Sequence, residues 1–202
     1  MNRDSNKKME KYFMNSRDIA TLSVFAALTV ALNLSPLKFP APYAPFLYYQ
    51  VWEIPIITAF ALYGPLIAVA ISIINTIALL VLFPGALLTG PLYNLAAILG
   101  MLLGVYIAHM LSEHLSLKGS VTLSMLATGF GILFRVIVML FVNWAFIRYP
   151  PPVGFSMTDE AILAILPFIA FFNATLALYT IPAGYMLARA VSSRIKINLW
   201  SP

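Results

Sequence analysis

The chain has 202 residues, of which 61% are hydrophobic and 9% are charged, and its mean hydropathy is +0.91. Soluble domains are nearer half apolar and a quarter charged, so the composition excludes a water-soluble fold and indicates one compact membrane bundle. The absence of cysteine excludes a disulfide framework and a thiolate nucleophile. The net charge of +5 fits basic residues beside membrane spans better than a nucleic-acid surface.

Residues 1–18 form a polar, basic segment without a small-residue cleavage site, so we do not expect a cleaved secretory signal. The first span covers about 19–34 and ends before Ser35-Pro36, because proline disfavours helix in the residue before it. The next segment, 37–53, cannot be a regular helix, since proline occupies positions 40, 42 and 45 among aromatic residues.

The apolar stretch that follows the proline-rich loop runs over 52–83, longer than one bilayer crossing of about 20 residues. Gly64-Pro65 divides it, which predicts a short second helix over 51–63 and a third over 66–83. A short span beside a proline-rich loop suggests that a cavity opens on that side of the membrane.

Three further spans are predicted over 91–111, 121–147 and 161–187, separated by polar or proline-rich loops. The predicted fold class is an all-α integral membrane protein, a six-transmembrane-helix bundle with a Pro/aromatic lid loop between its first two helices. Residues 19–188 form the membrane domain in this prediction, and 189–202 form a basic tail.

The distribution of Lys and Arg predicts the orientation of the bundle. Five precede the first helix, one is Lys118 and three lie in the tail, whereas the opposite side has only Lys38 and Arg148. The remaining one, Arg135, lies within a span. Both termini are therefore expected in the cytoplasm, and the lid loop is expected outside.

This topology brings aromatic and amide side chains from distant parts of the sequence to the outer ends of the helices. They offer flat apolar surfaces and a few hydrogen-bonding groups, which suit a neutral, planar solute. Two alternatives stay open: the aromatics can be interfacial anchors, and the asparagines can bond to neighbouring helices. The predicted ligand-binding residues are Lys38, Phe46, Tyr48, Glu53, Tyr93, Asn94, Asn143, Phe172 and Asn173.

Arg135 lies near the middle of the fifth predicted span, where an unpaired charge is unfavourable. We expect no acidic residue at its depth. The expected partners are backbone carbonyls, Asn75 or water in a cavity, and both a functional and a structural role stay open.

Small residues recur every four positions on two predicted helices, which permits close approach of another helix. On the first helix they are Ser23, Ala27 and Ala31, a docking face either for the bundle or for another subunit. Gly100 and Gly104 form a similar pair, for which packing within the bundle is expected.

Motifs for catalysis or ATP use are missing from the sequence. It contains no Gly-x-x-x-x-Gly-Lys-Ser/Thr phosphate loop, no Gly-x-Ser-x-Gly elbow and no His-Glu-x-x-His pair. We therefore predict neither an enzyme nor a metal site, and the chain cannot by itself drive ATP-dependent transport.

The ordered set of these features resembles the substrate-binding S component of energy-coupling factor (ECF) vitamin transporters, most closely the riboflavin-specific members. The resemblance covers about 15–190. The segments that carry it are the Ser23-Ala27-Ala31 stripe, Glu53-Ile54-Pro55, Gly64-Pro65, Gly90-Pro91-Leu92-Tyr93-Asn94, Asn143 and Phe171-Phe172-Asn173.

The resemblance implies a multi-pass protein of a prokaryotic cell membrane that captures riboflavin outside and needs no cofactor. A membrane T component and two cytoplasmic ATPases would supply energy, and the small-residue stripe would contact the T component. The first loop would act as a lid, and Asn94, Asn143 and Asn173 would bind the ligand. Binding of flavin mononucleotide is left open.

The sequence departs from the family pattern in the sixth helix. A lysine is expected shortly after the Phe-Asn step, and 174–177 instead reads Ala-Thr-Leu-Ala. Lys38 or Arg148 is a candidate substitute. Alternatives are an S component for thiamine, whose positive charge would require more carboxylates than Glu53, a stand-alone secondary carrier, or a small membrane enzyme.

Overall fold

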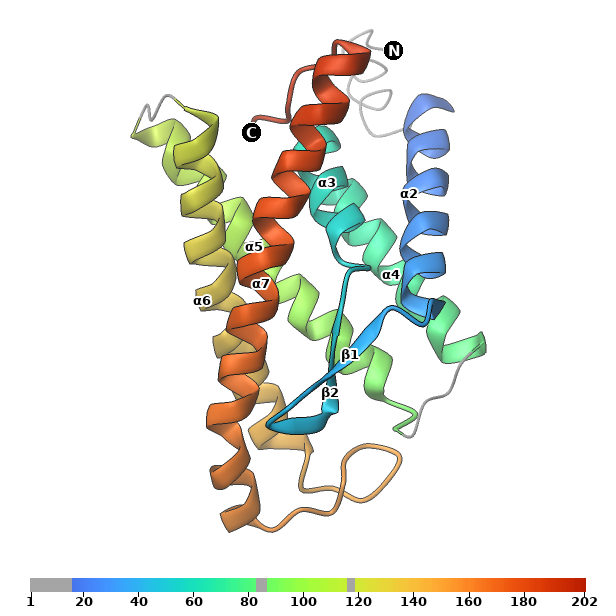
Figure 1. The fold of residues 1–202 in the computed structure, drawn as a ribbon, viewed down its shortest axis with the longest axis vertical. Coiled ribbons are helices and arrows are strands. Elements are labelled where there is room, and N and C mark those ends of the chain that lie inside the picture. Colours follow the sequence, from blue (N-terminus) through green and yellow to red (C-terminus); the bar gives the residue numbers. More distant parts are fainter. Residues whose placement is uncertain (1–15, 83–86, 116–118) are drawn as a thin grey trace, which may run out of the picture.

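The computed structural model describes residues 16–82, 87–115 and 119–202 as a helical bundle with one small hairpin at its side (Figure 1). Residues 1–15 and Lys118, which belong to the predicted cytoplasmic side, lie outside the described residues. The elements are α2 (Ser16–Leu34), β1 (Lys38–Ala41), β2 (Ala44–Gln50), α3 (Ile54–Tyr63), α4 (Pro65–Leu82), α5 (Gly90–His114), α6 (Ser120–Phe146) and α7 (Asp159–Ile195).

Each predicted span corresponds to a helix, and four described helices are long and apolar enough to cross a membrane. These are α4, α5, α6 from Val121 and α7. Helices α2 and α3 are shorter apolar helices. The chain is therefore a mostly helical protein with several apolar helices, whereas six crossings and cytoplasmic termini stay predictions.

The break between α3 and α4 lies at Gly64, as predicted. Gly64 has φ +91°, a conformation that glycine adopts at no steric cost, and Pro65 begins α4. The predicted start of α3 at Val51 was wrong, because the chain turns over 51–53 and the helix begins at Ile54. Pro55 then lies in the first turn of α3, where no intrahelical N–H donor is required.

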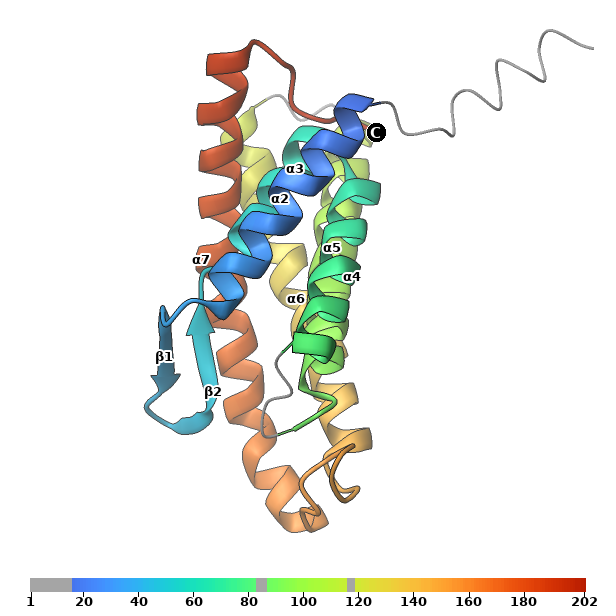
Figure 2. The same cartoon turned by 90° about the vertical axis from the view of Figure 1, so that its right-hand side faces the viewer.

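The lid loop is not irregular, and an all-α description of the fold was therefore incomplete. Strands β1 and β2 pair antiparallel, with Lys38 opposite Gln50 and Phe39 opposite Tyr49. Pro40 is tolerated because β1 is an edge strand, and the register shifts between Pro40 and Ala41. Figures 1 and 2 show the hairpin against the lower part of α7.

Helix α7 is the longest element, with 37 residues against the 27 predicted over 161–187. At about 1.5 Å per residue it is longer than the apolar core of a bilayer, about 30 Å thick. It begins where Thr158 Oγ1 accepts a hydrogen bond from Ala161 N, and Asp159 and Glu160 in its first turn favour the N-terminus. Its last turns include Arg189 and Arg194, which we had predicted to lie in a tail.

The core lies where α3 packs between the other helices, and it contains fully buried Ile56, Phe60, Ile71, Met101 and Ile181. The Gly100/Gly104 pair packs within the bundle, as expected. A Cβ at Gly104 would overlap the backbone of Phe130 on α6, so glycine permits the close contact of α5 with α6.

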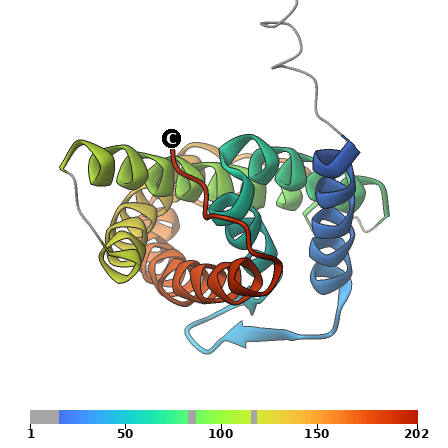
Figure 3. The ribbon, with the colours of Figure 1, turned by 90° about the horizontal axis from the view of Figure 1, so that it is seen from above.

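The residues after α7, 196–202, turn back across the upper end of the bundle, and we call them the C-terminal strap (Figure 3). Trp200 N donates a hydrogen bond to Ala61 O at 2.8 Å. The Trp200 ring packs against Phe60 and His109, with centroids 5.4 and 5.2 Å apart. A Cβ at Gly64 would lie 2.6 Å from Trp200 Nε1, so this glycine also leaves space for the strap.

Candidate functional site

A cavity of about 580 Å³ lies between the hairpin and the helices α5, α6 and α7. All nine predicted ligand-binding residues line it, although they come from six different segments of the chain. Their contact with a ligand stays a prediction. The cavity is lined by residues Asn33, Leu34, Lys38, Phe46, Leu47, Tyr48, Gln50, Trp52, Glu53, Leu79, Leu87, Gly90, Pro91, Tyr93, Asn94, Ala97, Arg135, Met139, Asn143, Ile147, Phe155, Ile169, Phe172, Asn173 and Leu176.

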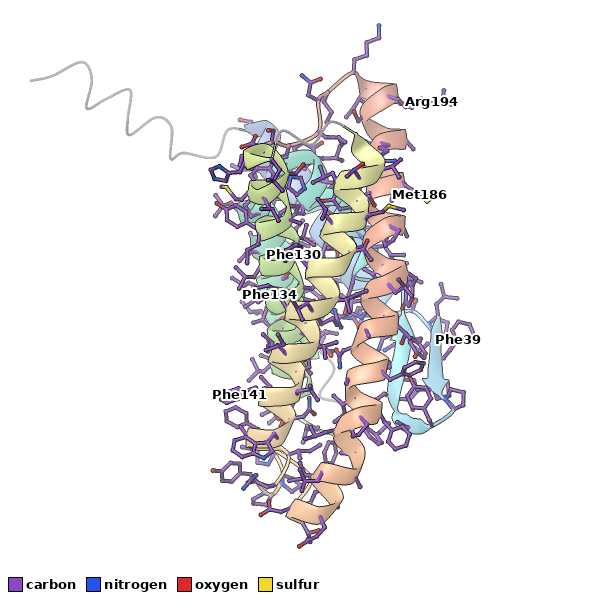
Figure 4. All side chains as sticks on the ribbon, turned by 90° about the vertical axis from the view of Figure 1, so that its left-hand side faces the viewer. Phe39, Phe130, Phe134, Phe141, Met186 and Arg194 are labelled. Atoms are coloured by element: carbon purple, nitrogen blue, oxygen red, sulfur yellow. The ribbon has the colours of Figure 1, made fainter. Side chains whose placement is uncertain are left out.

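The hairpin covers the cavity with Phe46 and Tyr48, which are 47% and 44% exposed. These exposed aromatic faces leave ring surface for a ligand to cover. Phe39 on β1 points away from the bundle (Figure 4) and is absent from the cavity wall. The alternation of the two strand faces thus separates cavity-lining aromatics from outward ones.

A chain of hydroxyl groups fixes the hairpin to α7. Tyr43 and Tyr49 share a hydrogen bond, and Tyr49 Oη lies 2.7 Å from Thr175 Oγ1. Burial, followed by the hydrogen bond to Tyr49, raises the pKa of Tyr43 to about 12, so its hydroxyl keeps its proton at neutral pH. Tyr49 also packs on Phe172, with ring centroids 5.0 Å apart.

The inner wall of the cavity contains a buried ion pair. Arg135 Nη1 and Nη2 donate to Glu53 Oε2 and Oε1 at 2.7 and 2.9 Å, and both side chains are 3% exposed. Arg135 Nε also donates to Asn173 Oδ1 at 3.0 Å. This bidentate geometry is the strongest form of an Arg–carboxylate contact.

Our expectation for Arg135 was therefore wrong, because an acidic residue does lie at its depth. The turn over 51–53 carries Glu53 into the bundle interior instead of leaving it at the membrane surface. Asn75, which we had considered as a partner, instead accepts a hydrogen bond from Asn33 Nδ2 at 3.4 Å.

The cavity asparagines differ in burial and in their bonds. Asn143 and Asn173 are buried, and each donates Nδ2 to a backbone carbonyl one helical turn earlier, at Met139 and Ile169. Asn94 is exposed at the cavity wall. The amides of Asn143 and Asn173 are thus oriented by their own helices before any ligand binds.

The structure separates the two cations considered as substitutes for a helix-six lysine. Lys38 lines the cavity, whereas Arg148 lies away from the described wall, 3.4 Å from Asp159 and over the Trp144 ring. Leu176, three residues after Asn173, contributes an apolar surface at the position in question.

The small-residue stripe of α2 lies on the surface of the chain. Ser23, Ala27 and Ala31 are all exposed, and α2 stands at one edge of the bundle (Figure 3). The stripe is therefore free of packing within the described bundle, and its role as a docking face stays a prediction.

Sequence analysis missed three polar side chains of the cavity wall, namely Asn33, Gln50 and Arg135. Gln50 could have been found, since it is the polar residue in the aromatic run that leads to Glu53. Within the described part of the chain, no three His, Asp or Glu side chains are grouped to hold a metal ion.

No known family model and no curated protein matches the sequence. Among solved structures, the chain is similar to the S component of a bacterial ECF transporter, with a TM-score of 0.63 at 16% sequence identity. The similarity covers 91% of this chain and 97% of that one. The chain therefore has the fold of an ECF transporter S component.

Proposed function

We propose that this chain is the riboflavin-binding S component of an ECF-type importer. It captures riboflavin at the outer face, and a T component with two cytoplasmic ATPases supplies the energy for its release inside. The observation that carries the proposal is the cavity under the hairpin, which combines aromatic rings and amides around a neutralised ion pair.

The size and lining of the cavity support a flavin. Its volume of about 580 Å³ falls within the range of about 300–1,000 Å³ typical of small-molecule sites. Phe46, Tyr48 and Phe172 provide flat surfaces for the isoalloxazine ring. The amides of Asn143 and Asn173 provide polar groups for its pyrimidine edge.

The charges of the described wall argue against thiamine. Glu53 is the acidic residue of this wall, and both of its oxygens accept hydrogen bonds from Arg135. Lys38 adds a positive charge that no described carboxylate pairs with. A cationic ligand would therefore meet no available carboxylate, whereas a neutral ring system meets no such penalty.

Reconstitution into liposomes tests the proposal as a whole. We expect the chain alone to bind riboflavin without accumulating it, and uptake to require the T component, the ATPases and ATP. Accumulation of riboflavin by the chain alone would contradict the proposal and identify a secondary carrier.

A further inference from the structure

Gln50 occupies a fixed position at the junction between the hairpin and the ion pair. It is the last residue of β2, three residues before Glu53, and it lines the cavity. Tyr179 Oη on α7 donates a hydrogen bond to Gln50 O, which holds the backbone at this point. The side chain therefore extends from a backbone anchored to α7.

The Gln50 side-chain oxygen is buried, and it accepts no hydrogen bond from any residue that the structure describes. The neighbouring acceptors differ, since Glu53 and Asn173 both accept hydrogen bonds from Arg135. A buried acceptor without a donor costs about 1–3 kcal/mol. Thr29 and Thr180 have hydroxyl oxygens in the same condition, but neither residue lines the cavity.

We propose that Gln50 is a specificity-determining residue whose Oε1 accepts a hydrogen bond from an N–H or O–H group of the ligand. This inference rests on the proposed flavin site and deepens it. A neutral amide oxygen selects a neutral donor, and a carbonyl or ether at the same place would leave two acceptors facing each other. Riboflavin has two kinds of donor, the imide N–H of its ring and the hydroxyls of its ribityl chain.

The substitution Gln50→Met tests the inference, because it keeps the length of the side chain and removes the acceptor. The full-length chain is titrated with riboflavin, with lumiflavin, which lacks the ribityl hydroxyls, and with 3-methylriboflavin, which lacks the imide N–H. We expect Gln50→Met to weaken riboflavin binding about tenfold, the loss of one buried hydrogen bond. Binding of the analogue that lacks the contacted donor changes less than threefold, which identifies that donor.

Two controls separate specificity from folding. Thr29→Val removes a buried oxygen away from the cavity and leaves all three affinities unchanged. The Tm of ligand-free Gln50→Met stays equal to that of the wild type or rises, since an unsatisfied acceptor has been removed.

Equal affinity of the wild type and Gln50→Met for riboflavin would overturn the inference while leaving the proposed function intact. The same loss toward all three flavins would also overturn it, because no particular donor would then depend on Gln50. If the wild type bound no flavin, the proposed function itself would fail, and this inference with it.

Discussion

At the scale of single residues, the Arg135–Glu53 pair determines the polarity of the site. Each charge alone would be strongly unfavourable in a membrane bundle, whereas the pair with Asn173 satisfies five polar contacts at once between α3, α6 and α7 only if all three stay together. The pair leaves the inner wall neutral, which is the property that a neutral ligand requires.

Breaking this pair is predicted to destabilise the fold. Glu53→Gln or Arg135→Met alone leaves one buried charge without its partner, so each lowers the free energy of unfolding by about 3–5 kcal/mol. The double variant contains neither charge and recovers most of that loss. Thermal unfolding of the detergent-solubilised variants measures this, and additive losses in the double variant would show that the two residues do not interact.

Asn143 offers the cleaner test of an amide contact with the ligand, since Asn173 also belongs to the ion-pair cluster. We expect Asn143→Ala to weaken riboflavin binding by about 1–3 kcal/mol, the cost of a lost buried hydrogen bond. Calorimetric titration measures the affinity. An unchanged affinity would assign Asn143 a purely structural role.

At the scale of elements, the hairpin is attached to the bundle mainly through hydroxyl groups. Tyr49 contacts both Tyr43 and Thr175 through its hydroxyl, and its ring packs on Phe172. Removal of that hydroxyl alters the attachment of the hairpin while preserving the packing of the ring.

Tyr49→Phe is therefore predicted to speed ligand release with little effect on folding. Two lost hydroxyl contacts of about 0.5–1.5 kcal/mol each raise the dissociation rate roughly tenfold. Stopped-flow fluorescence after dilution measures the rate. Tyr63→Phe, at the far end of α3, is the matched control, and equal rates in the two variants would contradict the role of the hairpin as a lid.

The C-terminal strap is a second element that stabilises the fold, at the end opposite the cavity. Its indole contacts α3 and α5 together, and its backbone bonds to Ala61. Trp200→Ala should lower stability by about 2 kcal/mol, roughly half the loss at a fully buried aromatic, because Trp200 is half-buried.

Chemical unfolding followed by intrinsic fluorescence measures that change in stability. Riboflavin affinity serves as the control, since no strap residue lines the cavity. A Trp200→Ala variant that lost affinity but not stability would show that the strap acts on the site.

At the scale of the whole molecule, the sequence predicted the helices well because each is a long apolar run bounded by proline, glycine or polar residues. It also predicted which residues gather around the cavity, since helix ends on one side of a membrane must meet. The predictions for Arg135 and for the hairpin failed for a common reason. Pairing over a separation of 82 residues, or between strands interrupted by proline, depends on tertiary contacts that leave no local pattern.

The exposed stripe on α2 leads to a prediction about assembly. Ala27→Arg should leave riboflavin affinity unchanged and abolish uptake by the full complex, because a long charged side chain prevents close helix contact. Leu28→Arg, on a face about 100° around the same helix, is the matched control and should retain uptake. Uptake by Ala27→Arg at the wild-type rate would place the T-component contact elsewhere.

The measurement that tests the central claim most directly is the absorbance and fluorescence spectrum of the purified chain, followed by titration of the stripped protein with riboflavin, flavin mononucleotide and thiamine. The account predicts a flavin spectrum, saturable quenching of riboflavin fluorescence and no binding of thiamine. A colourless protein that binds thiamine and ignores both flavins would contradict it.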